Sequence, residues 1–384
     1  MTADPSVWRV KGMPLAHATG RGVLDGKRLA VKDLFAITGF AVGGGNPAWL
    51  AEALPAAQDA PALARLRAAG AVVQGIAQTD EFAYSLSGAN VHYGAPPNPA
   101  APGLVTGGSS SGPASAVATG HADVGLGTDT SGSVRVPASC CGLFGMRPTH
   151  GAVPVDGVMP LAPSFDTVGW ITRDAPTLAA VGDVLLPPGS SEGPGRLVAV
   201  GGTVESAEPF GLPVVPGTLS TWDDPDPLLL AFRRVQSAEA WRLHGAWVDA
   251  HPRALASEVE ARFRFGSHVS AEEEASARAY LAQCRTELLT LLGDDAWLVL
   301  PAGGPGHARE LGLEGRDAWR RSILRCSVPA SAYGLPSVSI PTGADPPAGI
   351  ALIAPPGRDR ALLALVAAAF PKPVDHGSNG WRSG

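Results

Sequence analysis

The chain has 384 residues, of which 45% are hydrophobic and 17% are charged, a balance typical of a chain that folds around an apolar core. Glycine (48 residues) and proline (36 residues) exceed average usage, but no Gly-X-Y period runs through the chain, which excludes a collagen-like fibre. The net charge is −6 and like charges form no block, which argues against a surface for nucleic acid or for a membrane.

Two scarce residue types limit the chemistry. Any catalytic lysine must be one of only four, namely Lys11, Lys27, Lys32 and Lys372. The four cysteines show no zinc-binding spacing, and we expect them to be reduced and buried; they are Cys140, Cys141, Cys284 and Cys326. We therefore predict neither a metal nor another cofactor.

The sequence also predicts where the protein resides. Its N-terminus lacks the apolar region of a signal peptide. The longest apolar run, 361–370, is far shorter than the roughly 20 residues that cross a membrane. We therefore expect a cytoplasmic protein without a membrane partner.

In chain order, the first predicted elements are a strand over 28–35, a helix over 60–69 and a strand over 71–77. This strand–helix–strand alternation favours a layered α/β fold. Residues 88–112 are rich in Gly, Asn, Pro and Ser and indicate a long loop, after which 111–120 can form a short helix.

Further elements follow beyond this loop. A strand is predicted over 124–127 and a helix over 174–186, and the segment 187–195 (PPGSSEGPG) indicates a surface linker. Two longer helices are predicted over 226–249 and 270–292, the second opening with the Ser270 and Glu273 spacing of a capping box.

The C-terminal part returns to strands. They are predicted over 296–300, 337–341 and 350–354, with a closing helix over 359–370. Because strands recur at both ends of the chain, we predict one α/β domain over 1–384, and we expect 371–384 to be a mobile tail.

Two Gly/Ser-rich runs, 106–112 and 127–133, carry the densest chemical signal. Such runs are often flexible loops. A phosphate-binding loop is disfavoured because no lysine lies between Lys32 and Lys372. The pattern G-x-S-x-G around Ser110 matches a nucleophile elbow, but a loop precedes it where an elbow needs a strand.

A third interpretation is a hydrolase with a Ser–Ser–Lys site. Lys32 in Ala-Val-Lys-Asp, the run Gly-Gly-Ser-Ser from Gly107, and Gly-Thr-Asp-x-x-Gly-Ser-Val-Arg-x-Pro from Gly127 resemble the amidase signature family. Ser109 and Ser133 are 24 residues apart, as in that family. The resemblance covers about residues 24–185, weakens beyond the linker and returns at 298–301 and 337–341.

The resemblance implies a fold and a set of roles. The fold is a large domain with a central mixed β-sheet covered by helices on both faces. Ser133 is the nucleophile that becomes acylated, Ser109 follows a cis peptide and relays a proton, and Lys32 is the base that later protonates the leaving nitrogen. Since a lysine with an ordinary pKa of about 10.4 is protonated at neutral pH, this role requires burial, which the apolar neighbours of Lys32 favour.

Flanking residues complete the predicted site. The resemblance implies backbone N–H donors for the oxyanion from Thr130, Ser131 and Gly132, although many relatives have glycine where this chain has Ser131. Asp129 and Arg135 flank this turn and are predicted to pair as structural residues. The expected product is an acid plus ammonia from a small amide.

The substrate is predicted from weaker similarities. The stretches 80–94 and 164–170 look most like indole-3-acetamide hydrolases within the family, which favours an arylacetamide, and four side chains are candidates for the pocket lining: Phe82, Tyr84, Met159 and Phe165. A glutaminase-type subunit of an amidotransferase, a carboxylated-urea hydrolase and a non-catalytic binding protein on the same scaffold remain as alternatives. A homodimer is compatible with all of them.

Overall fold

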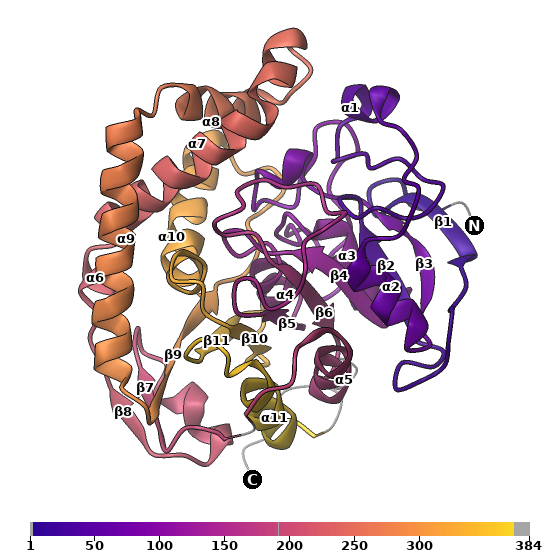
Figure 1. Ribbon diagram of the computed structural model, residues 1–384. Coiled ribbons are helices and arrows are strands. Elements are labelled where there is room, and N and C mark those ends of the chain that lie inside the picture. The colour runs from indigo at the N-terminus through magenta and orange to yellow at the C-terminus, as the bar shows by residue number, and fades with distance from the viewer. Residues whose placement is uncertain (1–2, 191, 372–384) are drawn as a thin grey trace.

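An 11-stranded mixed sheet runs through the computed structural model, which describes residues 3–190 and 192–371 (Figure 1). The sheet order is β1-β3-β2-β4-β6-β5-β10-β11-β9-β7-β8. In chain order the strands are β1 (Trp8–Ala16), β2 (Arg28–Lys32), β3 (Val72–Ala77), β4 (Val124–Thr128), β5 (Phe144–Arg147), β6 (Val168–Thr172), β7 (Arg196–Ala199), β8 (Val214–Pro216), β9 (Ala296–Gly303), β10 (Ser337–Pro341) and β11 (Gly349–Ile353).

Parallel and antiparallel pairs alternate in blocks along the sheet. β2 pairs in parallel with both β3 and β4, and β7 pairs in parallel with β8 and β9. Antiparallel pairs join these two blocks through β6, β5, β10 and β11. Because β5 pairs with β10, strands from before and after the predicted linker belong to one sheet.

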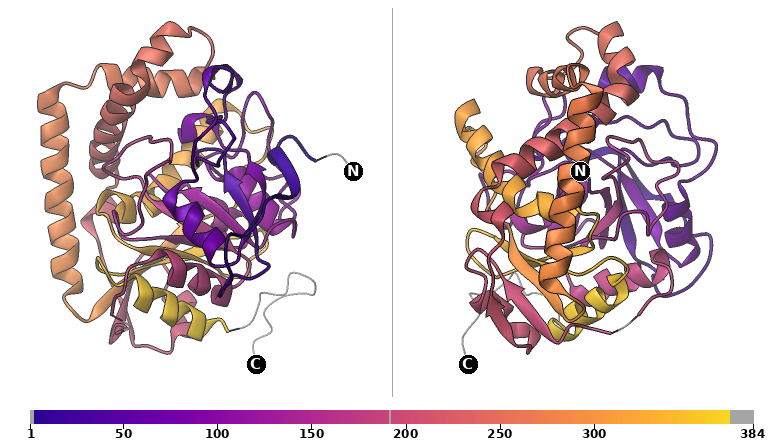
Figure 2. Two further views of the ribbon diagram at one scale, coloured as in Figure 1. Left: turned by 45° about the vertical axis from the view of Figure 1, so that its right-hand side comes forward. Right: turned by 60° about the vertical axis from the view of Figure 1, so that its left-hand side comes forward.

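Helices connect the strands and cover both faces of the sheet. They are α1 (Pro47–Glu52), α2 (Pro61–Ala68), α3 (Ser111–Ala118), α4 (Arg135–Cys140), α5 (Ala175–Leu185), α6 (Ser220–Asp223), α7 (Asp226–Ala250), α8 (Ser257–Ser267), α9 (Ala271–Leu292), α10 (Leu313–Ala332) and α11 (Asp359–Ala369), with short 3₁₀ helices η1 (Glu81–Ala83) and η2 (Glu205–Phe210). Figure 2 shows α9 standing at the edge of the molecule beside α7.

The period of two along the strands divides the core between the faces. In β2, Leu29 and Val31 join the core that contains α2, α5 and α11, whereas Ala30 joins the core that contains α3 and α4. In β9, Trp297 and Val299 face the first of these cores, and Leu298 and Leu300 face α7, α9 and α10. The predicted fold, a mixed sheet covered by helices on both faces, is therefore confirmed.

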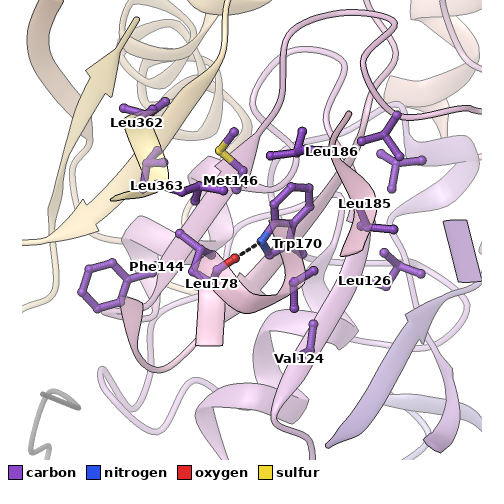
Figure 3. Packing of buried hydrophobic residues seen from close by; sticks show 14 of the residues in the cluster. Val124, Leu126, Phe144, Met146, Trp170, Leu178, Leu185, Leu186, Leu362 and Leu363 are labelled. Atoms are coloured by element: carbon purple, nitrogen blue, oxygen red, sulfur yellow. Dashed lines mark hydrogen bonds between the residues drawn. The ribbon is translucent and has the colours of Figure 1, made fainter. Parts of the chain in front are cut away.

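Trp170 of β6 lies at the centre of the first core (Figure 3). Its indole Nε1 donates to the carbonyl of Leu178 in α5 at 2.9 Å, so its polar atom is satisfied inside the apolar surroundings. Leu362 and Leu363 of α11 complete the packing on the far side of the cluster. This core ties the helix that precedes the linker to the last helix of the described chain.

Most predicted elements are confirmed within one or two residues at each end. Larger differences are confined to two strands. The strand predicted over 28–35 ends at Lys32, because the chain turns there with the Leu34 N–H bonded to the Lys32 carbonyl at 2.7 Å. The strand predicted over 296–300 continues to Gly303. The capping box between Ser270 and Glu273 is present at the start of α9.

Several elements had no sequence prediction, among them β1, β5, β6, β7, α8 and the 20-residue helix α10. The predicted linker contains no helix or strand in its described residues, and the four cysteines are free and buried. Pro371 is exposed, and the rest of the predicted tail, 372–384, lies outside the described residues. Within the described chain, no helix is long and apolar enough to cross a membrane.

Candidate active site

Lys32 is the last residue of β2 and is fully buried. Counting along the strand by twos places it on the same face as Ala30, toward α3 and α4. Its Nζ lies 2.8 Å from Ser109 Oγ and 2.9 Å from Thr128 Oγ1. Thr128 ends the neighbouring strand β4, so the order of the sheet places two hydroxyl groups around one amine.

The environment of Lys32 changes its acidity. Burial disfavours the charged ammonium and lowers the pKa of Lys32 to about 7, although Asp80, Asp129 and Asp166 oppose this shift from a distance. In the described chain no carboxylate forms an ion pair with Lys32. At neutral pH a substantial fraction of this amine is therefore neutral and can accept a proton.

Ser109 lies in the loop between η1 and α3, after a cis peptide bond from Gly108. Its carbonyl accepts hydrogen bonds from the Asp80 N–H at 3.1 Å and from Thr79 Oγ1 at 3.0 Å. A Cβ atom on Gly108 would lie 2.3 Å from Asp80 Oδ2, so the close approach of this carboxylate requires glycine there. The loop is thus held in place by the segment that follows β3.

Ser133 belongs to the second Gly/Ser-rich run and is buried at the entry to α4. Its carbonyl accepts a hydrogen bond from the Ser110 N–H at 3.1 Å, which joins the two runs directly beside Ser109. Ser110, the centre of the elbow pattern, donates its hydroxyl to the Thr128 carbonyl at 3.4 Å, and no strand precedes it. The structure therefore brings Lys32 to Ser109 and links Ser133 to the same loop.

Asp129 organises the second run. Its carboxylate accepts from the backbone N–H groups of Gly132 and Val134 at 3.0 and 3.2 Å. Arg135 donates Nη2 to Oδ1 at 2.8 Å and Nε to Oδ2 at 3.0 Å, which is a bidentate pair. Arg147 of β5, for which there was no sequence prediction, donates Nη1 to the same carboxylate at 3.1 Å.

These contacts decide the charge state of Asp129. Burial alone would raise its pKa, but Arg135, Arg147 and the backbone N–H donors outweigh burial and hold the pKa of Asp129 below its usual range. Arg135 also bonds to the Ser327 carbonyl at 2.9 Å and to Ser331 Oγ at 2.7 Å, both in α10. Asp129 and Arg135 thus hold the turn against a helix almost 200 residues away.

The three predicted oxyanion donors differ in their availability. The Gly132 N–H is occupied by Asp129, whereas the backbone N–H groups of Thr130 and Ser131 donate to no other described group. Gly132 has φ +121°, and a Cβ there would lie 2.6 Å from Ser327 Cβ, so this position needs glycine. Ser131 is absent from the described non-glycine residues with positive φ, so its backbone does not require the glycine found in many relatives.

Two buried acids near the site had no sequence prediction. Asp166 accepts from Thr130 Oγ1 at 2.6 Å and from the Leu161 N–H at 2.8 Å. Asp80 accepts from the Gly88 N–H at 3.0 Å, and its Oδ1 has no partner in the described chain. Burial raises the pKa of both carboxyl groups, so they hold their protons more tightly than exposed aspartates do.

A cavity of about 330 Å³ opens beside Thr128 and Thr130. Its apolar lining comes mainly from Leu34, Ala83 and 158–161, and its acidic lining from Asp156 and Asp166. Of the four predicted lining residues, only Met159 lies here. Phe82 packs among aromatic rings, Tyr84 bonds to Ser237, and Phe165 packs on Phe232.

Comparison with known proteins places this chain in a family. A family model described as Amidase matches residues 13–191. A protein named Amidase 1 from Arabidopsis thaliana is 36% identical over 404 aligned positions, covering 92% of this chain and 94% of the relative. The chain belongs to the amidase signature family. It is therefore a hydrolase that acts on amide C–N bonds.

Two further matches extend the comparison. A solved structure described as a crystal structure of amidase is 28% identical, with a TM-score of 0.78, and the match covers 90% of this amidase chain and 84% of the other. Outer envelope protein 64, chloroplastic, from Arabidopsis thaliana is 32% identical over 92% of this chain and 68% of that protein. The comparisons therefore show the family and the fold of this chain. The names of the relatives differ, since one states an amidase and another a location in the chloroplast envelope.

Proposed function

We propose that this amidase hydrolyses the amide of a small carboxylic acid through an acyl-enzyme formed on Ser133. The observation that carries the proposal is a fully buried lysine whose Nζ lies 2.8 Å from Ser109 Oγ and which has no carboxylate partner in the described chain. Such an amine is the base that a serine nucleophile requires.

The proposed steps leave Lys32, Ser109 and Ser133 in their starting protonation states after each turnover. Neutral Lys32 accepts the proton of Ser109 while Ser109 accepts the proton of Ser133, and Ser133 Oγ bonds to the substrate carbonyl carbon. The C–N bond then breaks as the leaving nitrogen receives the proton back from Lys32 through Ser109. Water releases the acid from Ser133 by the same transfers in the second half of the reaction.

The developing oxyanion needs hydrogen-bond donors that are free before the reaction. We assign this role to the backbone N–H groups of Thr130 and Ser131, which donate to no other described group. Gly132 remains a predicted donor, but its N–H is bonded to Asp129 Oδ1 at 3.0 Å in this structure. Its participation therefore requires that hydrogen bond to lengthen or to be shared.

For the substrate we propose a small primary amide with an apolar acyl group, with an arylacetamide such as indole-3-acetamide as the first candidate. The cavity beside Thr130 supports this choice, because its volume of about 330 Å³ and its apolar lining suit an aromatic group. Its described lining includes two aspartates and no cationic side chain, which disfavours a carboxylate in that cavity.

The decisive test is labelling with a fluorophosphonate probe, which reacts with activated serines. We expect one label per chain, at Ser133, and loss of the label in Ser133→Ala. Ser110→Ala is the matched control, because Ser110 is also a buried serine in the first run. Labelling at Ser110, or labelling that survives Ser133→Ala, would overturn the proposed mechanism.

Ammonia release from a panel of amides tests the substrate. The panel contains indole-3-acetamide, phenylacetamide, glutamine and carboxylated ureas. Preference for the aromatic amides supports the proposal, and preference for glutamine that appears only with a co-purified partner protein would favour a glutaminase-type subunit. Turnover of carboxylated ureas alone would favour the urea alternative.

A non-catalytic binding protein is the remaining alternative, since one relative is named for the chloroplast outer envelope and not for an activity. The buried pair of Lys32 and Ser109 supports catalysis instead. The cytoplasmic location and a homodimer stay proposals, which cell fractionation and light scattering would test.

A further inference from the structure

The segment that follows β3 holds the main chain of Ser109. Thr79 Oγ1 and the Asp80 N–H both donate to the Ser109 carbonyl, at 3.0 and 3.1 Å. The hydroxyl of the same serine lies 2.8 Å from Lys32 Nζ. A displacement of Asp80 would therefore also move the hydroxyl that Lys32 contacts.

The side chain of Asp80 packs on the residue before Ser109. A Cβ atom on Gly108 would lie 2.3 to 2.6 Å from the three heavy atoms of the Asp80 carboxylate group, so the carboxylate fits only beside glycine. Asp80 is fully buried, and its Oδ2 accepts from the Gly88 N–H at 3.0 Å. The Gly108 N–H donates to the Leu86 carbonyl at 2.8 Å, which joins the same two loops. Removal of the carboxylate would therefore leave a void beside Gly108.

Asp80 is also the least compensated of three buried acids that act on Lys32 through space. Asp129 forms ion pairs with two arginines, and Asp166 accepts from a hydroxyl and from two backbone N–H groups. In the described chain the Asp80 carboxylate forms no ion pair, and its Oδ1 has no hydrogen-bond partner. Among the three acids, Asp80 has the largest effect on Lys32.

The protonation of Asp80 and that of Lys32 depend on each other. Burial raises the pKa of Asp80, and the positive charge of Lys32 opposes this rise. The nearby hydroxyls of Ser111 and Ser85 also favour the carboxylate, and Arg262 of α8 attracts it through space. An ionised Asp80 in turn favours the ammonium form of Lys32, whereas burial favours the neutral amine.

We propose that Asp80 is a positioning residue for the pair of Lys32 and Ser109. Its backbone N–H and its carboxylate hold Ser109 in place, and its negative charge stabilises the protonated form of Lys32. Nothing in this proposal requires Asp80 to touch the substrate. Its consequence for catalysis rests on the proposed function, in which Lys32 is the base and Ser109 relays the proton.

The test measures the ionisation of Lys32 directly. The chain has only four lysines, so protein labelled with carbon-13 at lysine Cε gives four signals in a nuclear magnetic resonance spectrum. The signal of Lys32 is identified by its absence from Lys32→Met. Its chemical shift against pH gives the midpoint of the titration without any substrate. The pH profile of kcat/KM is measured in parallel.

Asp80→Asn separates the charge of this side chain from its shape. Asparagine has a similar volume, and its Oδ1 can still accept from the Gly88 N–H. Because the negative charge is lost, the midpoint of Lys32 should move to lower pH by about one unit. The midpoint of the kcat/KM profile should move equally, while kcat on the plateau at high pH stays within about threefold of wild type. A purely structural residue would leave both midpoints unchanged.

Asp80→Ala removes the packing on Gly108 together with the charge. The midpoint of Lys32 should move down as in Asp80→Asn. Because Ser109 is then held less firmly, kcat on the plateau should fall about tenfold with little change in KM. Circular dichroism checks the folding of both variants, and either variant alone tests the effect of the charge if the other fails to fold.

Asp123→Asn is the matched control. Asp123 precedes β4 at the end opposite Thr128, and its partly exposed carboxylate pairs with Arg28 and Arg173. This variant loses the same charge as Asp80→Asn from the far end of the same strand. Its midpoint for Lys32 and its kcat/KM should equal those of wild type.

The proposal is overturned if neither Asp80 variant lowers the midpoint of the Lys32 signal, or if Asp80→Ala keeps the plateau kcat of wild type. A lower midpoint of the Lys32 signal with an unchanged kcat/KM profile has a different meaning. It would support the action of Asp80 on Lys32 and contradict Lys32 as the base. Failure of the proposed function is thereby distinguished from failure of this inference.

Discussion

Two regions of this amidase bury basic side chains but give them opposite partners. Arg135 and Arg147 share the carboxylate of Asp129, with donor–acceptor distances of 2.8 and 3.1 Å. Lys32 is equally buried, but within the described residues its Nζ hydrogen-bonds only to the hydroxyl groups of Ser109 and Thr128. The first region is an ion network, and the second is an amine among neutral partners.

The difference separates charges that hold a turn in place from the amine that we propose as the base. Paired charges inside a protein keep their ionised forms, which suits groups that hold a turn in place. An unpaired buried amine instead titrates near neutral pH, which suits a group that must gain and lose a proton. The neighbouring acids Asp80 and Asp166 act on Lys32 only through space, so they weaken this effect without abolishing it.

The largest expected effect is on activity, from Lys32→Met. Methionine fills a similar volume without an amine, so the proposed base is lost and kcat/KM should fall by about 10²- to 10⁴-fold. The free energy of unfolding should be unchanged or higher, because the cost of burying the amine disappears. Steady-state ammonia release and denaturant unfolding measure the two quantities.

Lys27→Met is a matched control, since Lys27 precedes the same strand and its Nζ only approaches Thr177 Oγ1 at 3.4 Å. Its activity should be that of wild type. Wild-type rates in Lys32→Met would show that Lys32 is not the base. The difference between the Asp129 network and the Lys32 amine would then have no bearing on catalysis.

The next largest effect is on stability, from Arg147→Met. This change leaves the buried Asp129 carboxylate with one arginine instead of two and also removes the bond to the Phe165 carbonyl at 2.9 Å. The free energy of unfolding should fall by about 3–5 kcal/mol, the usual cost of breaking a buried pair. Urea unfolding followed by tryptophan fluorescence measures this loss.

Arg173→Met is the comparison variant for Arg147→Met, because the Arg173–Asp123 pair is partly exposed. It should lose about 1 kcal/mol or less through this pair. Equal losses in the two variants would show that the Asp129 network carries no special stability.

The third prediction concerns pH. The pKa of Lys32 is lowered to about 7, and only the neutral amine accepts a proton, so the active fraction rises as pH rises through 7. The value of kcat/KM should therefore fall about tenfold for each unit below that pKa and level off above it. A pH–rate profile between pH 5 and 9 measures the inflection.

Asp33 makes this test sharper. Burial raises the pKa of Asp33 to about 7 as well, but its carboxylate faces Arg9 and the Gly43 N–H. Asp33→Asn should keep the inflection if Lys32 causes it. Loss of the inflection in Asp33→Asn would show that the titrating group is Asp33 and not Lys32.

The smallest expected effect is from Thr128→Val. It removes one of the two hydroxyl partners of Lys32 Nζ and should lower kcat by about fivefold, the value of one hydrogen bond of about 1 kcal/mol. Thr128→Ser keeps the hydroxyl and should retain most of the activity. A loss of many orders of magnitude in Thr128→Val would show that this contact does more than orient the amine.

Local patterns in the sequence were enough to predict most of the elements. Apolar runs flanked by glycine or proline predicted β3, β4, β10 and α5, because there the local signal and the packed position agree. The helix α10 had no prediction, since arginines interrupt its apolar positions and Pro329 lies inside it. Strand β1 had none either, because Gly12 and Pro14 break its pattern, and its pairing with β3 depends on the fold and not on a local pattern.

The residues of the candidate site also fall into those that a local motif indicated and those that only the fold brings to the site. Motifs with fixed spacing indicated Lys32, Ser109, Ser133 and the pair of Asp129 with Arg135, while the chemical roles of these residues stay predictions. Arg147 and Asp166 carry no local motif, and they reach the site because β6 lies between β4 and β5 in the sheet.

The order of the sheet also has a consequence for how the chain acquires its structure. Lys32 meets Ser109 and Thr128 across 77 and 96 residues of chain, and Arg135 meets Ser331 across 196. Contacts between such distant residues form late and slowly, because a long loop must close before they are made. A refolding chain should therefore regain its helices well before it places Lys32 beside Ser109 and Thr128. Its activity should recover later than its circular dichroism signal.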